Sequence, residues 1–322
     1  MPIQSDSTVG RPFRQQAFSD LPEFPRRAHP YFTATAHDID VDSAALGSVR
    51  THYREYGVGA PLLLVHGLMT SGYSWRDVLD GLGARYRLVI PDLPGAGRSG
   101  IPAQGLSAPR LAAWIADFQS AIGIRGCPVV GNSLGGYLVM RQALADPGAF
   151  SKVVTIHAPA FPQVRLHALR AVLSVPRAGD ILGWWIRRDT QRWAHQAVHY
   201  YDDAHKSREE MREYGDPLRT VAGTRAFADY LREVMSPHDF AEFIALLERQ
   251  AAKGVDFPVP LQLIYSCQDP LVSPTVGARL AELIPNARLR WVDRSSHFVQ
   301  VDSPGVVVSQ VLEFLDTGNE QP

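Results

Sequence analysis

The feature that most limits the fold of this chain is a repeated order of short apolar run, loop and amphipathic helix. Three such units follow one another, with apolar runs at Leu62–Val65, Arg87–Ile90 and Pro128–Val130. Strands buried on both faces of a parallel sheet have this unbroken apolar character. Because parallel strands need a crossover between them, usually a helix, the order predicts a doubly wound, mostly parallel α/β sheet.

Alternating segments at Thr35–Val41 and Val49–Tyr56, with Gly47 between them, predict two antiparallel edge strands before the first unit. The strand and helix order stops after Ile156, and residues 158–255 are helical in character, rich in Trp, Tyr and Arg, without a strand-like run. It then resumes with two further strands and two helices. We therefore expect an insertion whose ends rejoin one sheet, rather than two domains side by side.

The chain has 322 residues, which at about 150 residues per domain leaves room for roughly two domains. Residues 1–30 are polar and interrupted by prolines. The expected organisation is an N-terminal arm, a core in two parts and a helical lid inserted between those parts. These segments are residues 1–30 (arm), 31–157 and 256–322 (core), and 158–255 (lid).

The composition excludes several classes of protein. Hydrophobic residues make up 45% and charged residues 20%, as in ordinary globular domains. Lys and Arg number 32 against 33 Asp and Glu, so the basic excess that nucleic-acid binding requires is missing. Two cysteines, Cys127 and Cys267, make neither a disulfide framework nor a metal cluster. Because no signal peptide or apolar membrane span is recognisable, we expect a cytoplasmic protein. We expect no nucleic-acid or membrane partner, and a homodimer is possible on the sequence alone.

The segment Gly131-Asn-Ser133-Leu-Gly135 carries the sharpest chemical signal. It matches G-x-S-x-G between an apolar strand and a helix, the context in which this pattern forms a nucleophile elbow. Glycines two residues either side of the serine lack the Cβ atoms that so sharp a turn would bring into collision. A chance Gly/Ser turn is the alternative. We predict that Ser133 is a nucleophile.

A serine nucleophile needs a base, and the base needs an orienting carboxylate. Asp269 and His297 each follow the end of a late strand, the position at which doubly wound folds place their sites. The order serine, aspartate, histidine is the one used with such an elbow. Three further aspartates compete with Asp269 for this role: Asp256 before the strand, Asp293 as an outer partner, and Asp302 as a cap of the last helix.

Two backbone N–H groups should stabilise the oxyanion that forms during acyl transfer. The amide of Leu134 directly follows the nucleophile. The loop after the first buried strand contains Gly67, which allows its amides to turn inward, and we assign Leu68 as the second donor.

Several motifs together resemble the α/β-hydrolase fold superfamily, in the expected order and over nearly the whole chain. They are His66–Arg76, Pro91–Ser99, Gly131–Gly136, Asp269–Pro270 and His297–Pro304. Within the superfamily, the first and last stretches resemble haloalkane dehalogenases and epoxide hydrolases, which carry an aspartate nucleophile usually followed by Trp. This chain has Ser133 followed by Leu134, so the resemblance favours an acyl-serine route.

The elbow is also similar to that of serine-dependent meta-cleavage-product hydrolases, which split carbon–carbon bonds. That resemblance implies a cation for the substrate carboxylate, and Arg187 or Arg188 could supply it or could belong to a solvated helix face. A non-catalytic ligand receptor on a hydrolase scaffold is a third hypothesis.

The sequence thus predicts a cofactor-free, metal-free serine hydrolase that acts on a carboxylic ester or related small acyl compound. The lid would wall an apolar pocket over the nucleophile. His157 either lines that pocket or is a structural histidine. The residues expected to contact substrate are Met69, His157, Trp184, Trp185 and Phe298.

Overall fold

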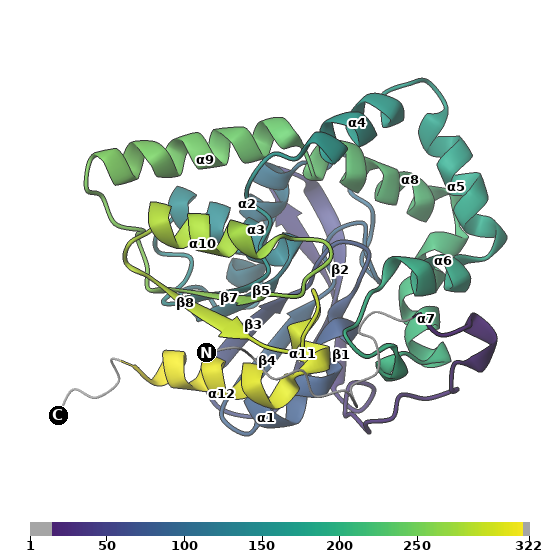
Figure 1. Cartoon of the computed structure of the whole chain (residues 1–322), viewed down its shortest axis with the longest axis horizontal. Coiled ribbons are helices and arrows are strands. Elements are labelled where there is room, and N and C mark those ends of the chain that lie inside the picture. The colour runs from purple at the N-terminus through teal and green to yellow at the C-terminus, as the bar shows by residue number, and fades with distance from the viewer. Residues whose placement is uncertain (1–14, 318–322) are drawn as a thin grey trace, which may run out of the picture.

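One eight-stranded sheet forms the centre of the computed structural model, which describes residues 15–317 (Figure 1). The strand order is β1-β2-β4-β3-β5-β6-β7-β8. The β1–β2 and β2–β4 pairs are antiparallel and the other pairs are parallel, so the predicted doubly wound, mostly parallel sheet is confirmed. The strands are β1 (Thr35–Ser43), β2 (Gly47–Tyr56), β3 (Pro61–Val65), β4 (Arg87–Pro91), β5 (Val129–Asn132), β6 (Val153–Ile156), β7 (Leu261–Ser266) and β8 (Ala287–Val292).

Helices cover both faces of this sheet, as Figure 1 shows with α2, α3 and α10 on one side and α1 and α12 on the other. These core helices are α1 (Leu79–Gly83), α2 (Ala108–Ala121), α3 (Leu134–Ala145), α10 (Pro274–Leu283), α11 (Val299–Asp302) and α12 (Pro304–Asp316). Before α1, the chain forms a 3-10 helix over Gly72–Val78 that leads directly into it.

The strands divide their side chains between two apolar layers. In β3, Leu63 and Val65 belong to one buried cluster and Leu62 and Leu64 to the other, all fully buried. Burying one such side chain contributes roughly 1.5–3 kcal/mol relative to exposure. This two-sided burial fixes the register of the central strands and with it the loops at their carboxyl ends.

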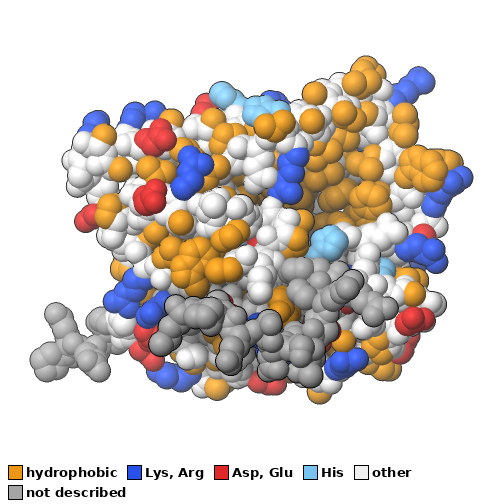
Figure 2. All heavy atoms as spheres, viewed as in Figure 1, with side chains coloured by type: hydrophobic (Ala, Val, Ile, Leu, Met, Phe, Trp, Pro, Cys, Tyr) orange, Lys and Arg blue, Asp and Glu red, His pale blue; other side chains and the backbone are white. Residues whose placement is uncertain are grey.

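Between β6 and β7 the chain forms helices and no strand, as predicted for the insertion. They are α4 (Val164–Leu173), α5 (Ala178–Arg188), α6 (Thr190–Ala197), α7 (Arg208–Gly215), α8 (Val221–Asp229) and α9 (Pro237–Ala252), with short turns of 3-10 or π helix at Asp203–His205, Asp216–Arg219 and Tyr230–Val234. Figure 2 shows hydrophobic side chains gathered over α4 and α5. The exposed ones are Val164, Val172, Val175, Ile181, Trp184 and Trp185.

The described part of the N-terminal segment lies against this insertion, where Figure 1 places it beside α7. The amides of Arg208 and Glu209 donate to the carbonyls of Pro22 and Glu23, at 2.8 and 3.0 Å. Residues 1–14 of the predicted arm lie outside the described range. Within residues 15–317, none of the helices has the length and apolar character needed to cross a membrane.

Candidate active site

Ser133 lies at the sharp turn between β5 and α3, with φ 52° and ψ −120°. A non-glycine residue adopts such a conformation only when its surroundings hold it there. The Ser133 amide donates to the carbonyl of Ile156 on the neighbouring strand, at 2.7 Å. The side chain is only 9% exposed and lines a large apolar cavity.

The glycines on either side of Ser133 are required by backbone contacts. A Cβ on Gly131 would lie 2.6 Å from the carbonyl carbon of Gly135, and a Cβ on Gly135 would lie 2.2 Å from the carbonyl oxygen of Val65. Both distances are far below van der Waals contact. The G-x-S-x-G spacing therefore follows from how closely α3 approaches β3 and β5.

Asp269 and His297, from the loops after β7 and β8, are brought together. The Nδ1 atom of His297 lies 2.7 Å from Oδ2 of Asp269. The other oxygen, Oδ1, accepts the backbone N–H groups of Leu271 and Val272 at 2.6 and 3.0 Å. Because these two amides fix the carboxylate, Oδ2 is held toward the imidazole. His297 lines the same cavity as Ser133.

The Asp269 carboxylate is held in its charged form. Burial disfavours that form, yet the nearby His297 and the hydrogen-bonding side chains of His157 and His297 outweigh the burial and hold the pKa of Asp269 well below its usual range. A charged, fixed carboxylate next to Nδ1 leaves Nε2 of His297 as the nitrogen that can accept a proton.

His157 does not line the cavity, which corrects its prediction as a substrate contact. It is fully buried directly after β6, with Nδ1 2.8 Å from Oδ2 of Asp269. Its Nε2 accepts the backbone N–H of Ser266 at 3.0 Å. Burial lowers the pKa of His157. β6 and β7 are neighbours in the sheet, so a histidine directly after one strand and an aspartate after the other can meet. The positions of His157 and Asp269 after these strands were the sequence signal for their contact.

The sequence suggested that Asp302 caps the last helix, but the structure gives this carboxylate other partners. Its Oδ2 accepts the amide and hydroxyl of Ser296, at 2.7 and 2.5 Å, and its Oδ1 accepts the amide of Tyr201 at 3.0 Å. Burial raises the pKa of Asp302 to about 6. The residue therefore joins the loop that carries His297 to the helical insertion.

Asp256 and Asp293, the remaining two competitors of Asp269, are exposed.

The loop after β3 lies against the turn that carries Ser133. A Cβ on Gly67 would lie 3.1 Å from Cβ of Ser133, and Met69 has a positive φ of 59°. His66 holds the loop, because its Nδ1–H donates to the carbonyl of Gly67 at 2.8 Å while its Nε2 accepts the amide of Leu93 at 2.9 Å. Leu68 is in this loop and lines the cavity.

A cavity of about 460 Å³ lies between the sheet and the helical insertion, within the usual size range of ligand pockets. Met69 and Phe298 line it, whereas Trp184 and Trp185 do not, which corrects that prediction: they lie on the outer face of α5, 48% and 57% exposed. The lining residues are Gly67–Thr70, Asn132, Ser133, Pro159, Gln163, Arg165, Leu166, Leu169, Ala197, Val198, Phe227, Met235, Leu271, Val272, His297 and Phe298.

Arg187 and Arg188 are also placed outside this cavity. Arg187 donates to the hydroxyl of Thr224 at 2.5 Å, and the Arg188 guanidinium lies 4.0 Å from the ring centre of Trp184. Arg165 of α4 is the arginine among the lining residues, and it donates to the carbonyl of Leu271. The two arginines suggested for a substrate carboxylate therefore have other partners.

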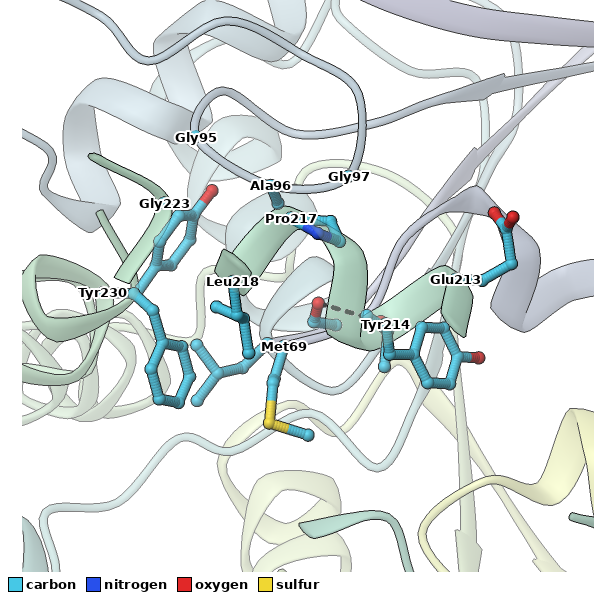
Figure 3. Close-up of a pocket in the computed structure, with 14 residues that line it drawn as sticks. Met69, Gly95, Ala96, Gly97, Glu213, Tyr214, Pro217, Leu218, Gly223 and Tyr230 are labelled. Atoms are coloured by element: carbon cyan, nitrogen blue, oxygen red, sulfur yellow. Dashed lines mark hydrogen bonds between the residues drawn. The ribbon is translucent and has the colours of Figure 1, made fainter. Parts of the chain in front are cut away.

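A second, much smaller cavity of about 30 Å³ lies beside the loop after β3 (Figure 3). Met69, Leu218 and Tyr230 are among its lining residues, and it shares Gly67–Thr70 and Phe227 with the large cavity. A void of this size is large enough for one water molecule.

Among the described residues, His157, Asp269 and His297 offer ligand atoms within 4.8 Å of one another and could by chemistry hold a metal ion. Both Nδ1 atoms, however, lie within 2.8 Å of one carboxylate oxygen. A neutral imidazole that contacts a carboxylate in this way donates a proton from Nδ1. The arrangement is that of hydrogen-bond donors around an acceptor.

Acid is expected to destabilise this fold through five buried or half-buried histidines, whose pKa values burial lowers from the ordinary 6.5. They are His66, His157, His195, His199 and His205. Because the unfolded chain binds protons at these sites before the folded one does, the free energy of unfolding should fall as the pH drops below about 6.5. Urea denaturation between about pH 7.5 and 5.5 measures this. His238→Gln, at an exposed position, should leave the slope unchanged, and a stability that is flat or rises toward acid contradicts the expectation.

The fold and the site geometry agree with the comparison to known families. The family described as alpha/beta hydrolase fold matches residues 60–304. The chain therefore belongs to the α/β-hydrolase family. Strands β3 to β8, the serine at the turn before α3, and the late aspartate and histidine all lie in the matched region, whereas β1 and β2 precede it.

Individual relatives are distant. A putative carbamate hydrolase, RutD, of Azorhizobium caulinodans is 25% identical over 279 residues, covering 83% of this chain and 96% of the relative. The epoxide hydrolase CorEH superposes with a TM-score of 0.71 at 20% identity, covering 87% of this chain and 99% of the other. The meta-cleavage product hydrolase CumD, as an A129V mutant, gives 0.64 at 23% identity, covering 86% and 98%. The two solved structures support the fold alone.

Proposed function

We propose that this protein is a serine hydrolase that cleaves a carboxylic ester or related acyl compound through an acyl-Ser133 intermediate. The observation that carries the proposal is that Ser133, on its strained turn, and His297, hydrogen-bonded to Asp269, line one apolar cavity. The chain's distant likeness to a putative carbamate hydrolase is consistent with it.

In the proposed reaction, Nε2 of His297 takes the proton of the Ser133 hydroxyl as its oxygen attacks the substrate carbonyl. The backbone N–H groups of Leu68 and Leu134 stabilise the oxyanion. His297 then protonates the leaving group, and its Nε2 next takes a proton from the water that hydrolyses the acyl-enzyme. Asp269 keeps the proton of His297 on Nδ1 throughout. No cofactor or metal takes part in these steps.

The insertion would act as the lid over this site and set the substrate's size. Leu166 and Leu169 of α4 line the cavity, whereas Val172 on the same helix is 60% exposed. We propose that an apolar acyl or aryl group occupies the space beneath α4. The carbon–carbon bond hydrolase is the less supported candidate, because Arg187 and Arg188 have partners away from the cavity.

A chain-length series of p-nitrophenyl esters tests this function. From acetate to hexanoate we expect kcat/KM to rise by up to about 4-fold per methylene, the factor that corresponds to about 0.8 kcal/mol for each buried group. Leu169→Trp should abolish the preference for the longer esters by filling the cavity, while the matched Val172→Trp, on the outer face of α4, should leave it intact. Turnover of a meta-cleavage dienoate without ester turnover would overturn the proposal.

A further inference from the structure

We propose that His157 is a fourth member of this site, a positioning residue whose Nδ1–H faces Oδ2 of Asp269 at close range, so that His157 and His297 share that oxygen. The inference rests on the proposed function, because it gives His157 a part in the same serine chemistry. Four donors then surround one carboxylate: the amides of Leu271 and Val272 on Oδ1, and two imidazoles on Oδ2.

The tautomer of His157 follows from its other partner. The backbone N–H of Ser266 can only donate, and it lies 3.0 Å from Nε2 of His157. Nε2 must therefore be unprotonated, and a neutral imidazole then carries its proton on Nδ1. That Nδ1 lies 2.8 Å from Oδ2 of Asp269. His157 thus carries its proton on the nitrogen that faces the carboxylate, with the backbone of Ser296 as a second partner, and burial lowers the pKa of the ring, which favours its neutral form.

The two histidines share the oxygen unequally. Nδ1 of His297 meets Asp269 at 2.7 Å with the alignment of a hydrogen bond, whereas Nδ1 of His157 approaches the same oxygen to 2.8 Å without that alignment. A carboxylate that also interacts with a second donor stabilises the His297 imidazolium less than one that serves His297 alone. His157 therefore both orients Asp269 and moderates the basicity that Asp269 confers on His297.

The local backbone supports a role beyond filling space. His157 has a positive φ of 51°, and its amide donates to the carbonyl of Ile264 on β7 at 2.9 Å. Strained non-glycine residues persist where the surroundings hold them, and they gather at functional sites. The titratable groups that face the ring are Asp269, His297 and Tyr265, whose ring packs edge-on at 5.3 Å and whose hydroxyl donates to Ala158.

Two substitutions separate positioning from packing. His157→Phe keeps an aromatic ring but has no donor, and we expect kcat/KM on a short ester to fall about 10- to 100-fold. The acid limb of its pH profile should also move to higher pH, because Asp269 then acts on His297 alone. His157→Asn keeps a donor near Nδ1 and tolerates the positive φ, so it should restore most of the activity and the wild-type limb. Equal losses in both variants with no shift of the limb would overturn the proposal.

A measurement on the wild-type protein covers the case in which His157→Phe does not fold. Nitrogen-15 NMR of imidazole-labelled protein should show His157 protonated at Nδ1 and not at Nε2, without titration between about pH 5.5 and 8. Protonation at Nε2, or titration in this window, would overturn the proposal. Failure of the proposed function looks different: a fluorophosphonate would then leave Ser133 unlabelled while the His157 signal keeps the expected tautomer.

Discussion

Replacing Ser133 with alanine is expected to lower kcat on a p-nitrophenyl ester by at least about 10⁴-fold. The change removes the atom that forms the acyl bond, while the Leu68 loop, His297 and the cavity stay in place. Because alanine keeps the Cβ at the strained position, no new backbone contact arises, and Ser133 lies in a site lined by apolar groups. The melting temperature should therefore stay near that of the wild type.

The matched control is Ser120→Ala on the exposed face of α2. It removes a hydroxyl that donates to the carbonyl of Ala116 at 2.8 Å, and Ser120 is not among the residues that line the cavity. Its kcat should equal the wild-type value. If Ser133→Ala retains wild-type turnover, another residue is the nucleophile and the proposed mechanism is wrong.

Replacing Asp269 with asparagine should lower kcat/KM by about 10⁴-fold by forcing His297 into the wrong tautomer. Oδ1 of the side chain accepts the amides of Leu271 and Val272, so the asparagine oxygen must stay there. Its NH₂ group then faces Nδ1 of His297, which has to become an acceptor. The proton moves to Nε2, and in the proposed mechanism His297 can then no longer accept the serine proton.

His157 makes this substitution harder to accommodate. Its Nε2 already accepts the amide of Ser266, so its Nδ1 cannot also become an acceptor of the new NH₂ group. We expect the melting temperature of Asp269→Asn to fall as well, which thermal denaturation measures. The controls are Asp256→Asn and Asp293→Asn, at exposed positions, and both should keep full activity. Loss of activity in a control equal to that in Asp269→Asn would contradict the assignment.

Much of this fold could be predicted because its signals are local. An unbroken apolar run such as Leu62–Val65 is typical of a strand buried on both faces, and the crossover rules then favour a doubly wound, mostly parallel sheet. The glycines of the elbow are equally informative, since Gly135 meets the backbone of Val65. The contact between Asp269 and His297 could be predicted because each residue follows the carboxyl end of a late strand.

The errors arose where a side chain's direction depends on distant packing. Trp184 and Trp185 are adjacent in α5, and the helical pattern alone did not show that both would face outward. Asp302 stands where a helix cap is expected, but Ser296 and Tyr201 supply its donors from other segments. The contact of His157 with Asp269 needs the β6–β7 register, Ile156 beside Ile264, which no local pattern encodes.

The most direct test of the central claim is to treat the wild-type protein with a fluorophosphonate and locate the adduct by peptide mass spectrometry. The account predicts one adduct per chain, on the peptide that contains Ser133, formed with loss of esterase activity in equal proportion. The Asp269→Asn variant should label far more slowly, because its His297 cannot accept the serine proton. An unlabelled protein that still hydrolyses esters, or an adduct on another residue, would contradict the assignment of Ser133 as the nucleophile.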